Sequence, residues 1–161
     1  MIDKEVFLEL AHSQELLRGL ETRHLERLAG LAKQVDFDCN QAIFPEIDKH
    51  GFFYLILEGS VALELVTAGR PDVLQTLHAG DAAGWPWLLD GRRLAQQLSA
   101  RALTPTRVTA FDGVQLRAAC ESDPVFGYAI LKALAAVLAK RLDASYLQLL
   151  DSYTTPAMIH G

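Results

Sequence analysis

Two glycines flank a short acidic corner near the middle of the chain, in the segment Gly80-Asp81-Ala82-Ala83-Gly84. Because glycine has no Cβ, the main-chain amides beside it can approach an anion closely. The next residues, Trp85-Pro86-Trp87, add two indoles that can either stack on a planar ligand or fill a pocket. This pattern favours the binding of a small anionic molecule at the corner.

The other reactive side chains do not form a catalytic or metal-binding pattern. None of the histidines pairs with another at a spacing typical of a metal site, and the two cysteines have no Cys-x-x-Cys partner. A haem ligand would have to be drawn from Cys39, His78 and Cys120, and nothing in the sequence singles one of them out. Glu46 and Asp48 are expected to be solvated in a turn rather than to act as an acid-base pair. We therefore expect no catalytic residues, no metal and no required cofactor.

Many short strands precede and follow the glycine-bounded corner. The runs rich in β-branched and aromatic residues, separated by turn residues, are 41–44, 52–57, 61–66, 73–77, 98–102 and 107–111. Regular spacing of many short strands predicts a closed roll or sandwich, and we expect about eight strands in all. Turn residues between the runs include Glu58-Gly59 and Ala68-Gly69-Arg70-Pro71.

Helical periodicity occupies both ends of the chain. Apolar residues recur at helical spacing from Asp3 to about Lys33, and the period returns after Phe111. Asp123-Pro124 is a typical helix start, with an acceptor at the cap and proline in the first turn. Beyond it, residues that recur alternately four and three positions apart form a heptad seam, and this seam predicts a dimer interface. Its members are Leu131, Ala135, Leu138, Leu142, Ser145, Leu149 and Ser152.

A flank of the same predicted helix, with Ile130, Leu134 and Val137, can pack on the chain's own core. The alternative is that the whole apolar set is buried within one domain. We favour a homodimer through Leu131, Leu138, Leu142 and Leu149, because a helix of nearly thirty residues extends roughly 40 Å, past the edge of a small roll.

The composition limits the class of protein. The chain has 161 residues, a formal net charge of −5 and a sequence pI near 5.5. That charge argues against direct binding of nucleic acid, which usually needs clustered Lys and Arg. Neither a membrane-spanning run nor a signal peptide is apparent, so we expect a cytoplasmic protein.

The order of these segments resembles the cyclic-nucleotide-binding domain of Crp/Fnr-type regulators over about residues 14–150. The resemblance is carried by Ile43-Phe44-Pro45-Glu46-Ile47-Asp48, then 53–61, then Gly80-Asp81-Ala82-Ala83-Gly84. It implies an α+β fold: a double-stranded β-helix, or jelly-roll-like β-roll, with short N-terminal helices and a long C-terminal dimerisation helix. One domain is expected, with helices at 3–34, the roll at 35–111, further helices at 112–152 and a tail at 153–161.

The resemblance also implies a ligand site with a cyclic phosphate on the cassette that follows the glycine-acid turn. Gly59, Gly80, Asp81 and Gly84 match family positions, whereas Trp85 replaces the glutamate that binds ribose. Gln96-Gln97 stands where the family has the arginine of its phosphate clamp, and Arg92 or Arg93 is a weaker substitute. Asn40 and Ile47 replace turn glycines, of which only Asn tolerates positive φ. The expected ligand-binding residues are Gly80, Asp81, Gly84, Trp85, Pro86, Trp87, Gln96, Gln97, Arg141 and Ser145.

By this resemblance, we expect a ligand-sensing regulatory protein with cyclic AMP or cyclic GMP as candidate ligand. It would signal through a dimer to an unknown partner protein and without a DNA-binding module of its own. The alternative is a degenerate domain that no longer binds a cyclic nucleotide and serves as a constitutive dimeric interaction module. Losing the charge-assisted bond to a phosphodiester would weaken binding by roughly ten- to hundredfold.

Overall fold

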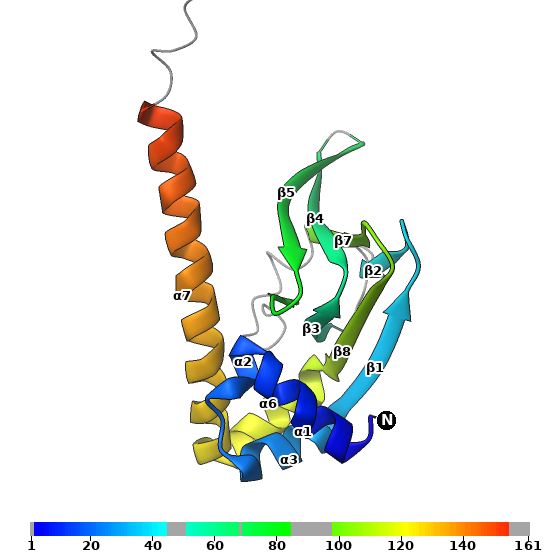
Figure 1. Cartoon of the computed structure of the whole chain (residues 1–161), viewed down its shortest axis with the longest axis vertical. Coiled ribbons are helices and arrows are strands. Elements are labelled where there is room, and N and C mark those ends of the chain that lie inside the picture. The colour runs from blue at the N-terminus through cyan, green and yellow to red at the C-terminus, as the bar shows by residue number, and fades with distance from the viewer. Residues whose placement is uncertain (1, 45–50, 68, 85–97, 155–161) are drawn as a thin grey trace, which may run out of the picture.

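Two four-stranded antiparallel sheets form the centre of the computed structural model, which describes residues 2–44, 51–67, 69–84 and 98–154 (Figure 1). The strand order is β1-β8-β3-β6 in one sheet and β2-β7-β4-β5 in the other. The strands are β1 (Ala32–Phe37), β2 (Ala42–Phe44), β3 (Phe52–Glu58), β4 (Ser60–Thr67), β5 (Arg70–His78), β6 (Ala82–Ala83), β7 (Leu98–Ala102) and β8 (Thr106–Asp112). The expected α+β fold with a jelly-roll-like β-roll is confirmed.

Three short helices lie beneath the roll: α1 (Lys4–Ser13), α2 (Glu15–Arg18) and α3 (Thr22–Leu31). Asp3 caps α1 by accepting a hydrogen bond from the amide of Glu5 at 2.8 Å. The predicted apolar faces are buried, with Phe7 and Ala11 from α1 and Leu25 and Leu28 from α3. These helices therefore close one end of the roll.

The strand boundaries differ from the sequence prediction in three places. Residues 32–37 form β1, so the roll begins within the segment assigned to the N-terminal helices. The short strand β6 was not predicted, because two alanines carry little strand signal. Arg70 and Pro71, expected in a turn, belong to β5 and pair with Thr67 and Val66. Proline is tolerated there because β5 is an edge strand.

The core has two parts. The lower part combines the N-terminal helices and the C-terminal helices with Phe53, Leu55 and Phe111 of the roll. The upper part lies between the two sheets and includes Ile56, Val61 and Leu77. Asn40 adopts φ 68°, which confirms the expected positive φ at this turn, whereas Ile47 lies outside the described residues.

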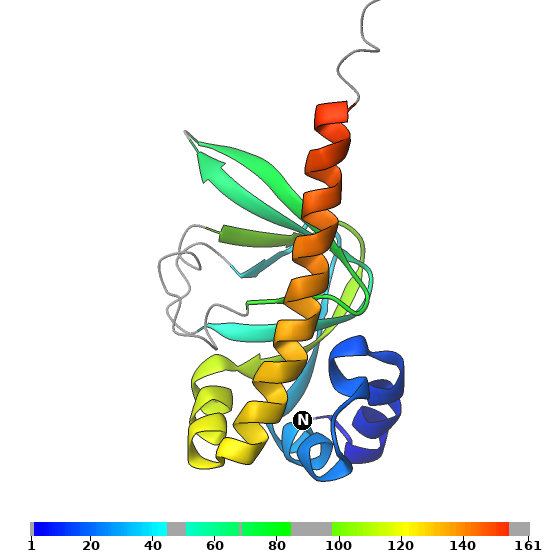
Figure 2. The same cartoon turned by 90° about the vertical axis from the view of Figure 1, so that its left-hand side faces the viewer.

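Two helices complete the chain: α6 (Gly113–Ser122) and α7 (Pro124–Thr154). Asp112 caps α6 by accepting from the amides of Val114 and Gln115 at 2.9 and 3.1 Å. The start of α7 at Pro124 confirms the predicted helix start, and α7 runs along the whole molecule (Figure 2). No described helix combines the length and apolar character needed to cross a bilayer.

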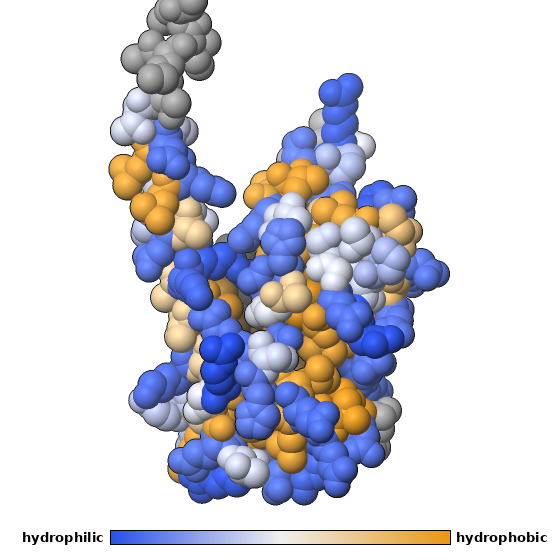
Figure 3. All heavy atoms as spheres, viewed as in Figure 1, coloured by the Kyte–Doolittle hydropathy of each residue, from blue (hydrophilic) through white to orange (hydrophobic). Residues whose placement is uncertain are grey.

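The predicted division of α7 into two faces holds except at Leu138. Ile130, Leu134 and Val137 are buried against the rest of the domain. Leu131, Leu142 and Leu149 remain 40%, 51% and 55% exposed, whereas Leu138, expected on the exposed seam, is partly buried against the chain's own core. Apolar residues are visible on the part of α7 that extends beyond the roll (Figure 3). The lone chain thus leaves an apolar stripe on this helix uncovered.

Candidate ligand-binding site

The glycine-bounded corner joins β5 to β6 and is held mainly by its own main chain. Gly80 has φ 93°, and its amide donates to the carbonyl of Ile56 at 2.9 Å. The amide of Asp81 donates to the carbonyl of His78 at 3.0 Å, and its carboxylate accepts from the His78 amide at 2.9 Å. The amides of Gly80 and Asp81 are already bonded, so these two do not lie open to an anion. Asp81 shapes the turn.

Gly84 ends the described part of the corner in a close contact with β3. Its φ is 76°, and a Cβ at this position would overlap the carbonyl oxygen of Phe52. Ala82 and Ala83, in β6, pair with Leu55 and Tyr54 and are buried. The second glycine is therefore required because β3 and β6 approach closely here.

Arg141 connects helix α7 with this corner. Its Nη2 donates to the carbonyl oxygen of Ala82 at 2.7 Å. Its Nε is buried and has no hydrogen-bond partner among the described residues. Desolvation by burial lowers the pKa of Arg141, and the negative charge of Asp81 opposes that shift. A partly desolvated cation with a free donor thus lies beside the corner, and it is suited to an anionic partner.

Ser145, one turn beyond Arg141, is exposed and donates its hydroxyl to the Arg141 carbonyl at 3.1 Å. The hydroxyl oxygen still has acceptor capacity, so a ligand's donor could bind to it. The two helical candidates therefore lie on successive turns of α7, but only Arg141 contacts the corner.

Gln14, between α1 and α2, was missed by the sequence analysis. It is only 5% exposed, and its Oε1 has no partner among the described residues. A Cβ at Gly80 would come within 3.9 Å of that oxygen, so the amide lies beside the corner. No periodicity or motif marks Gln14, because its position depends on how the N-terminal helices pack under the roll.

The remaining predicted site residues, Trp85, Pro86, Trp87, Gln96 and Gln97, lie outside the described residues. The same holds for the alternatives Arg92 and Arg93 and for Glu46, Asp48 and His50. Within the described ranges, no three His, Cys, Asp or Glu side chains are grouped to hold a metal. Cys39 and Cys120 are both free thiols.

Comparison with known proteins agrees with this geometry. A sequence profile described as the cyclic nucleotide-binding domain matches residues 34–123, which is more than half of the chain. The chain belongs to the cyclic nucleotide-binding domain family. The profile spans the roll from within β1 and includes the corner, and it ends just before α7. No curated protein matches the sequence.

Solved structures of cyclic nucleotide-binding domains and of regulators have the same fold. A protein from Geobacter metallireducens, described as a putative cyclic nucleotide-binding protein, is 26% identical and has a TM-score of 0.74. The match covers 88% of this chain and 99% of that one. The N-terminal domain of a transcriptional regulator from Streptomyces coelicolor is 24% identical, with a TM-score of 0.64 and 84% and 94% of the two chains covered.

The sensor domain of the regulator DNR from Pseudomonas aeruginosa is 18% identical, with a TM-score of 0.65. That match covers 87% of this chain and 93% of the other. At this identity the likeness concerns the fold alone. The cyclic nucleotide-binding fold is therefore shared with sensor domains whose sequences have diverged widely.

Proposed function

We propose that this cyclic nucleotide-binding domain is a non-enzymatic regulatory sensor that binds a small anionic molecule, with cyclic AMP or cyclic GMP as the first candidates. The single observation that supports the proposal is the contact of Arg141 with Ala82 at 2.7 Å. It joins the long helix directly to the corner where the family resemblance puts the ligand.

Arg141 is well suited to replace the missing clamp arginine. The sequence has Gln96-Gln97 where the family carries that arginine, so a bound phosphodiester needs another cation. Arg141 is half-buried and retains an unpartnered Nε among the described residues. An anion that accepts from this nitrogen would regain a charge-assisted bond, and its charge would favour the cationic form that burial disfavours. We propose Gly84, Trp85 and Ser145 as further contacts of the same ligand.

The same side chain gives a route for signalling. Arg141 is part of α7, so a ligand that draws the guanidinium away from the Ala82 carbonyl changes the tie between this helix and the roll. The exposed stripe of Leu131, Leu142 and Leu149 lies on that helix. We propose that two copies pair through this stripe and that ligand occupancy changes the dimer surface presented to a partner protein.

A second candidate function rests on the same hydrogen bond. Since Arg141 already has an acceptor in Ala82, the bond can hold α7 in one position without any ligand. The domain would then be a constitutive dimeric interaction module. The absence of the family's clamp arginine, which would weaken binding of a nucleotide, agrees with this alternative. Ligand-dependent stabilisation separates the two candidates.

The test is thermal unfolding of the full chain with and without 1 mM cyclic AMP or cyclic GMP. A ligand at 100 times its Kd stabilises by about 2.7 kcal/mol, which raises the Tm by roughly 5–10 °C for a domain of this size. Arg141→Gln should reduce that rise by half or more, whereas the matched exposed variant Arg18→Gln should leave it unchanged. No rise with either nucleotide, together with a stable dimer, would favour the constitutive module.

A further inference from the structure

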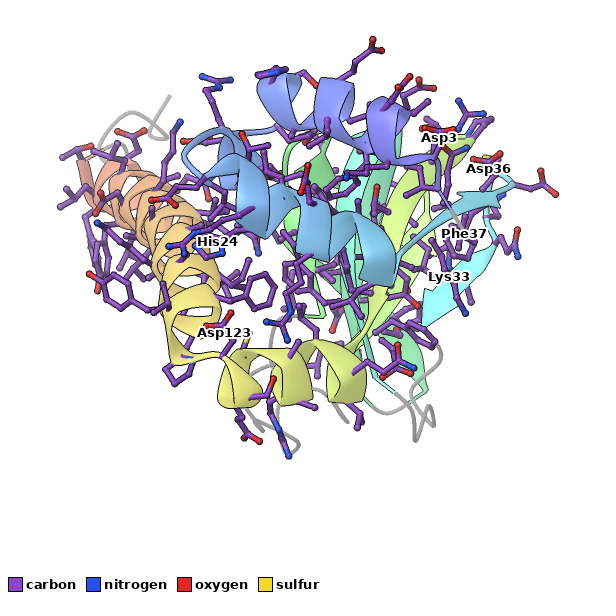
Figure 4. The ribbon with its side chains drawn as sticks, turned by 90° about the horizontal axis from the view of Figure 1, so that it is seen from below. Asp3, His24, Lys33, Asp36, Phe37 and Asp123 are labelled. Carbon is purple, nitrogen blue, oxygen red and sulfur yellow. The ribbon has the colours of Figure 1, made fainter. Side chains whose placement is uncertain are left out.

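A concave site lies outside the roll, in the groove between α2–α3 and the first half of α7. Its volume is about 400 Å³, within the range of small-molecule pockets. The groove follows α7 from Val125 to Val137, which is roughly 18 Å of helix. In Figure 4, His24 lies on the side of α3 that faces α7. This groove is separate from the corner at Gly80–Gly84.

The walls of the groove are largely apolar. Leu16 and Leu20 line the side of the N-terminal helices, while Ala133 and Ala136 line the side of α7. The small alanines keep the groove open, because a larger side chain on this face of α7 would occupy it. Tyr128, at the rim, is 68% exposed, so apolar surface remains available to a bound molecule.

Among the described residues at the groove, one cationic side chain has no carboxylate partner. Glu15 pairs with Lys140 at 3.1 Å, and Glu21 pairs with Arg23 at 2.9 Å. Lys132 has no carboxylate partner among the described residues; its Nζ lies 5.8 Å from the ring centroid of Tyr128. The groove therefore combines an apolar wall with a single unpaired positive charge, which complements a molecule with an apolar body and one anionic group.

We propose that this groove binds a small amphipathic acid, with its carboxylate at Lys132 and its apolar body along Leu16, Leu20 and Ala136. Binding there would tighten the joint between the N-terminal helices and α7. The N-terminal helices and α7 already share a buried core, and exposed ion pairs such as Arg27 with Asp123 at 2.9 Å and Glu15 with Lys140 lie around it. Such a ligand would act on α7 from outside the roll and independently of a nucleotide.

The test uses decanoate, decanol and decyltrimethylammonium below their micellar concentrations, added to the full chain without nucleotide and followed by displacement of 1-anilinonaphthalene-8-sulfonate. Decanoate should bind most tightly and the cation most weakly. Lys132→Glu should weaken decanoate by roughly tenfold and leave decanol unchanged. Ala136→Trp should abolish binding of both. The matched controls Lys33→Glu on β1 and Ala118→Trp on α6 should bind as the parent does.

Three results would overturn the proposal. One is the absence of saturable binding up to 1 mM decanoate, and another is equal affinity for decanoate and the cation. The third is a change of oligomeric state in Ala136→Trp by analytical ultracentrifugation, because the groove would then be an interface between copies. Retention of decanoate binding by Arg141→Gln would show that this site is independent of the proposed nucleotide site; loss of that binding would contradict a separate site.

Discussion

Replacing Gly84 with alanine should destabilise the fold for two reasons: backbone strain at a positive φ and steric overlap with β3. The residue has φ 76°, a conformation that costs a non-glycine residue about 1–2 kcal/mol. The added methyl would also overlap the Phe52 carbonyl oxygen, so β3 and β6 must separate. Their ladder joins only Tyr54 to Ala83 and Leu55 to Ala82, and weakening it costs about 1 kcal/mol per lost hydrogen bond.

The expected destabilisation of Gly84→Ala is therefore about 2–4 kcal/mol, or roughly 6–12 °C in Tm for a chain of this length. Two further glycines give matched controls. Gly69 has φ 77° with nothing within 4 Å of its Cβ position, so Gly69→Ala should lose only about 1 kcal/mol. Gly30 lies in α3 with open space around it, so Gly30→Ala should gain about 0.5–1 kcal/mol.

Thermal and urea unfolding followed by circular dichroism would measure all three variants under the same conditions, without ligand. From most to least stable, the expected order is Gly30→Ala, parent, Gly69→Ala and Gly84→Ala. If Gly84→Ala were as stable as Gly69→Ala, the close approach of β3 and β6 would not contribute, and the structural role assigned to this glycine would be refuted.

Three further predictions concern the helices and the thiols. Asp112→Ala should destabilise the chain by about 1 kcal/mol in urea unfolding, because two amides of α6 lose their acceptor; no change would mean that water replaces the cap. Leu142→Glu should give a monomer in analytical ultracentrifugation if the exposed stripe on α7 pairs two copies, and a persistent dimer would disprove that pairing. Cys39 is exposed and should react with a thiol reagent faster than Cys120 at pH 8. Burial raises the pKa of Cys120, so less of it is thiolate at this pH. Equal rates would contradict that burial.

Most of the fold could be predicted from local sequence patterns. The alternating strands and the two faces of α7 follow from side-chain periodicity, which depends only on neighbours along the chain. Strand β1 was missed because it follows α3 directly at Ala32, without turn residues to mark the change. The role of Pro71 was misjudged because its tolerance depends on β5 being an edge strand, which is a property of the sheet and not of the segment.

The candidate site was predictable only where a residue type is itself informative. Gly84 could be recognised because only glycine fits its backbone and its contact with Phe52. The bonded amides of Gly80 and Asp81 were not foreseeable, since their acceptors depend on how the corner folds back on β3 and β5. Gln14 and the orphaned Nε of Arg141 depend on contacts between distant elements, which no single-sequence pattern reports.

The pairing of β1 with β8 constrains how the chain can fold as it is synthesised. Ala32 lies opposite Phe111 and Phe37 lies opposite Thr106, so the first strand of the roll gains its partner only after nearly all the others have left the ribosome. Until then the apolar inner faces of the early strands lack their cover, and such exposed strand edges favour aggregation. Slower translation of the segment that encodes 98–112 would lengthen that interval, and a chaperone that shields nascent β-strands would have its greatest effect there.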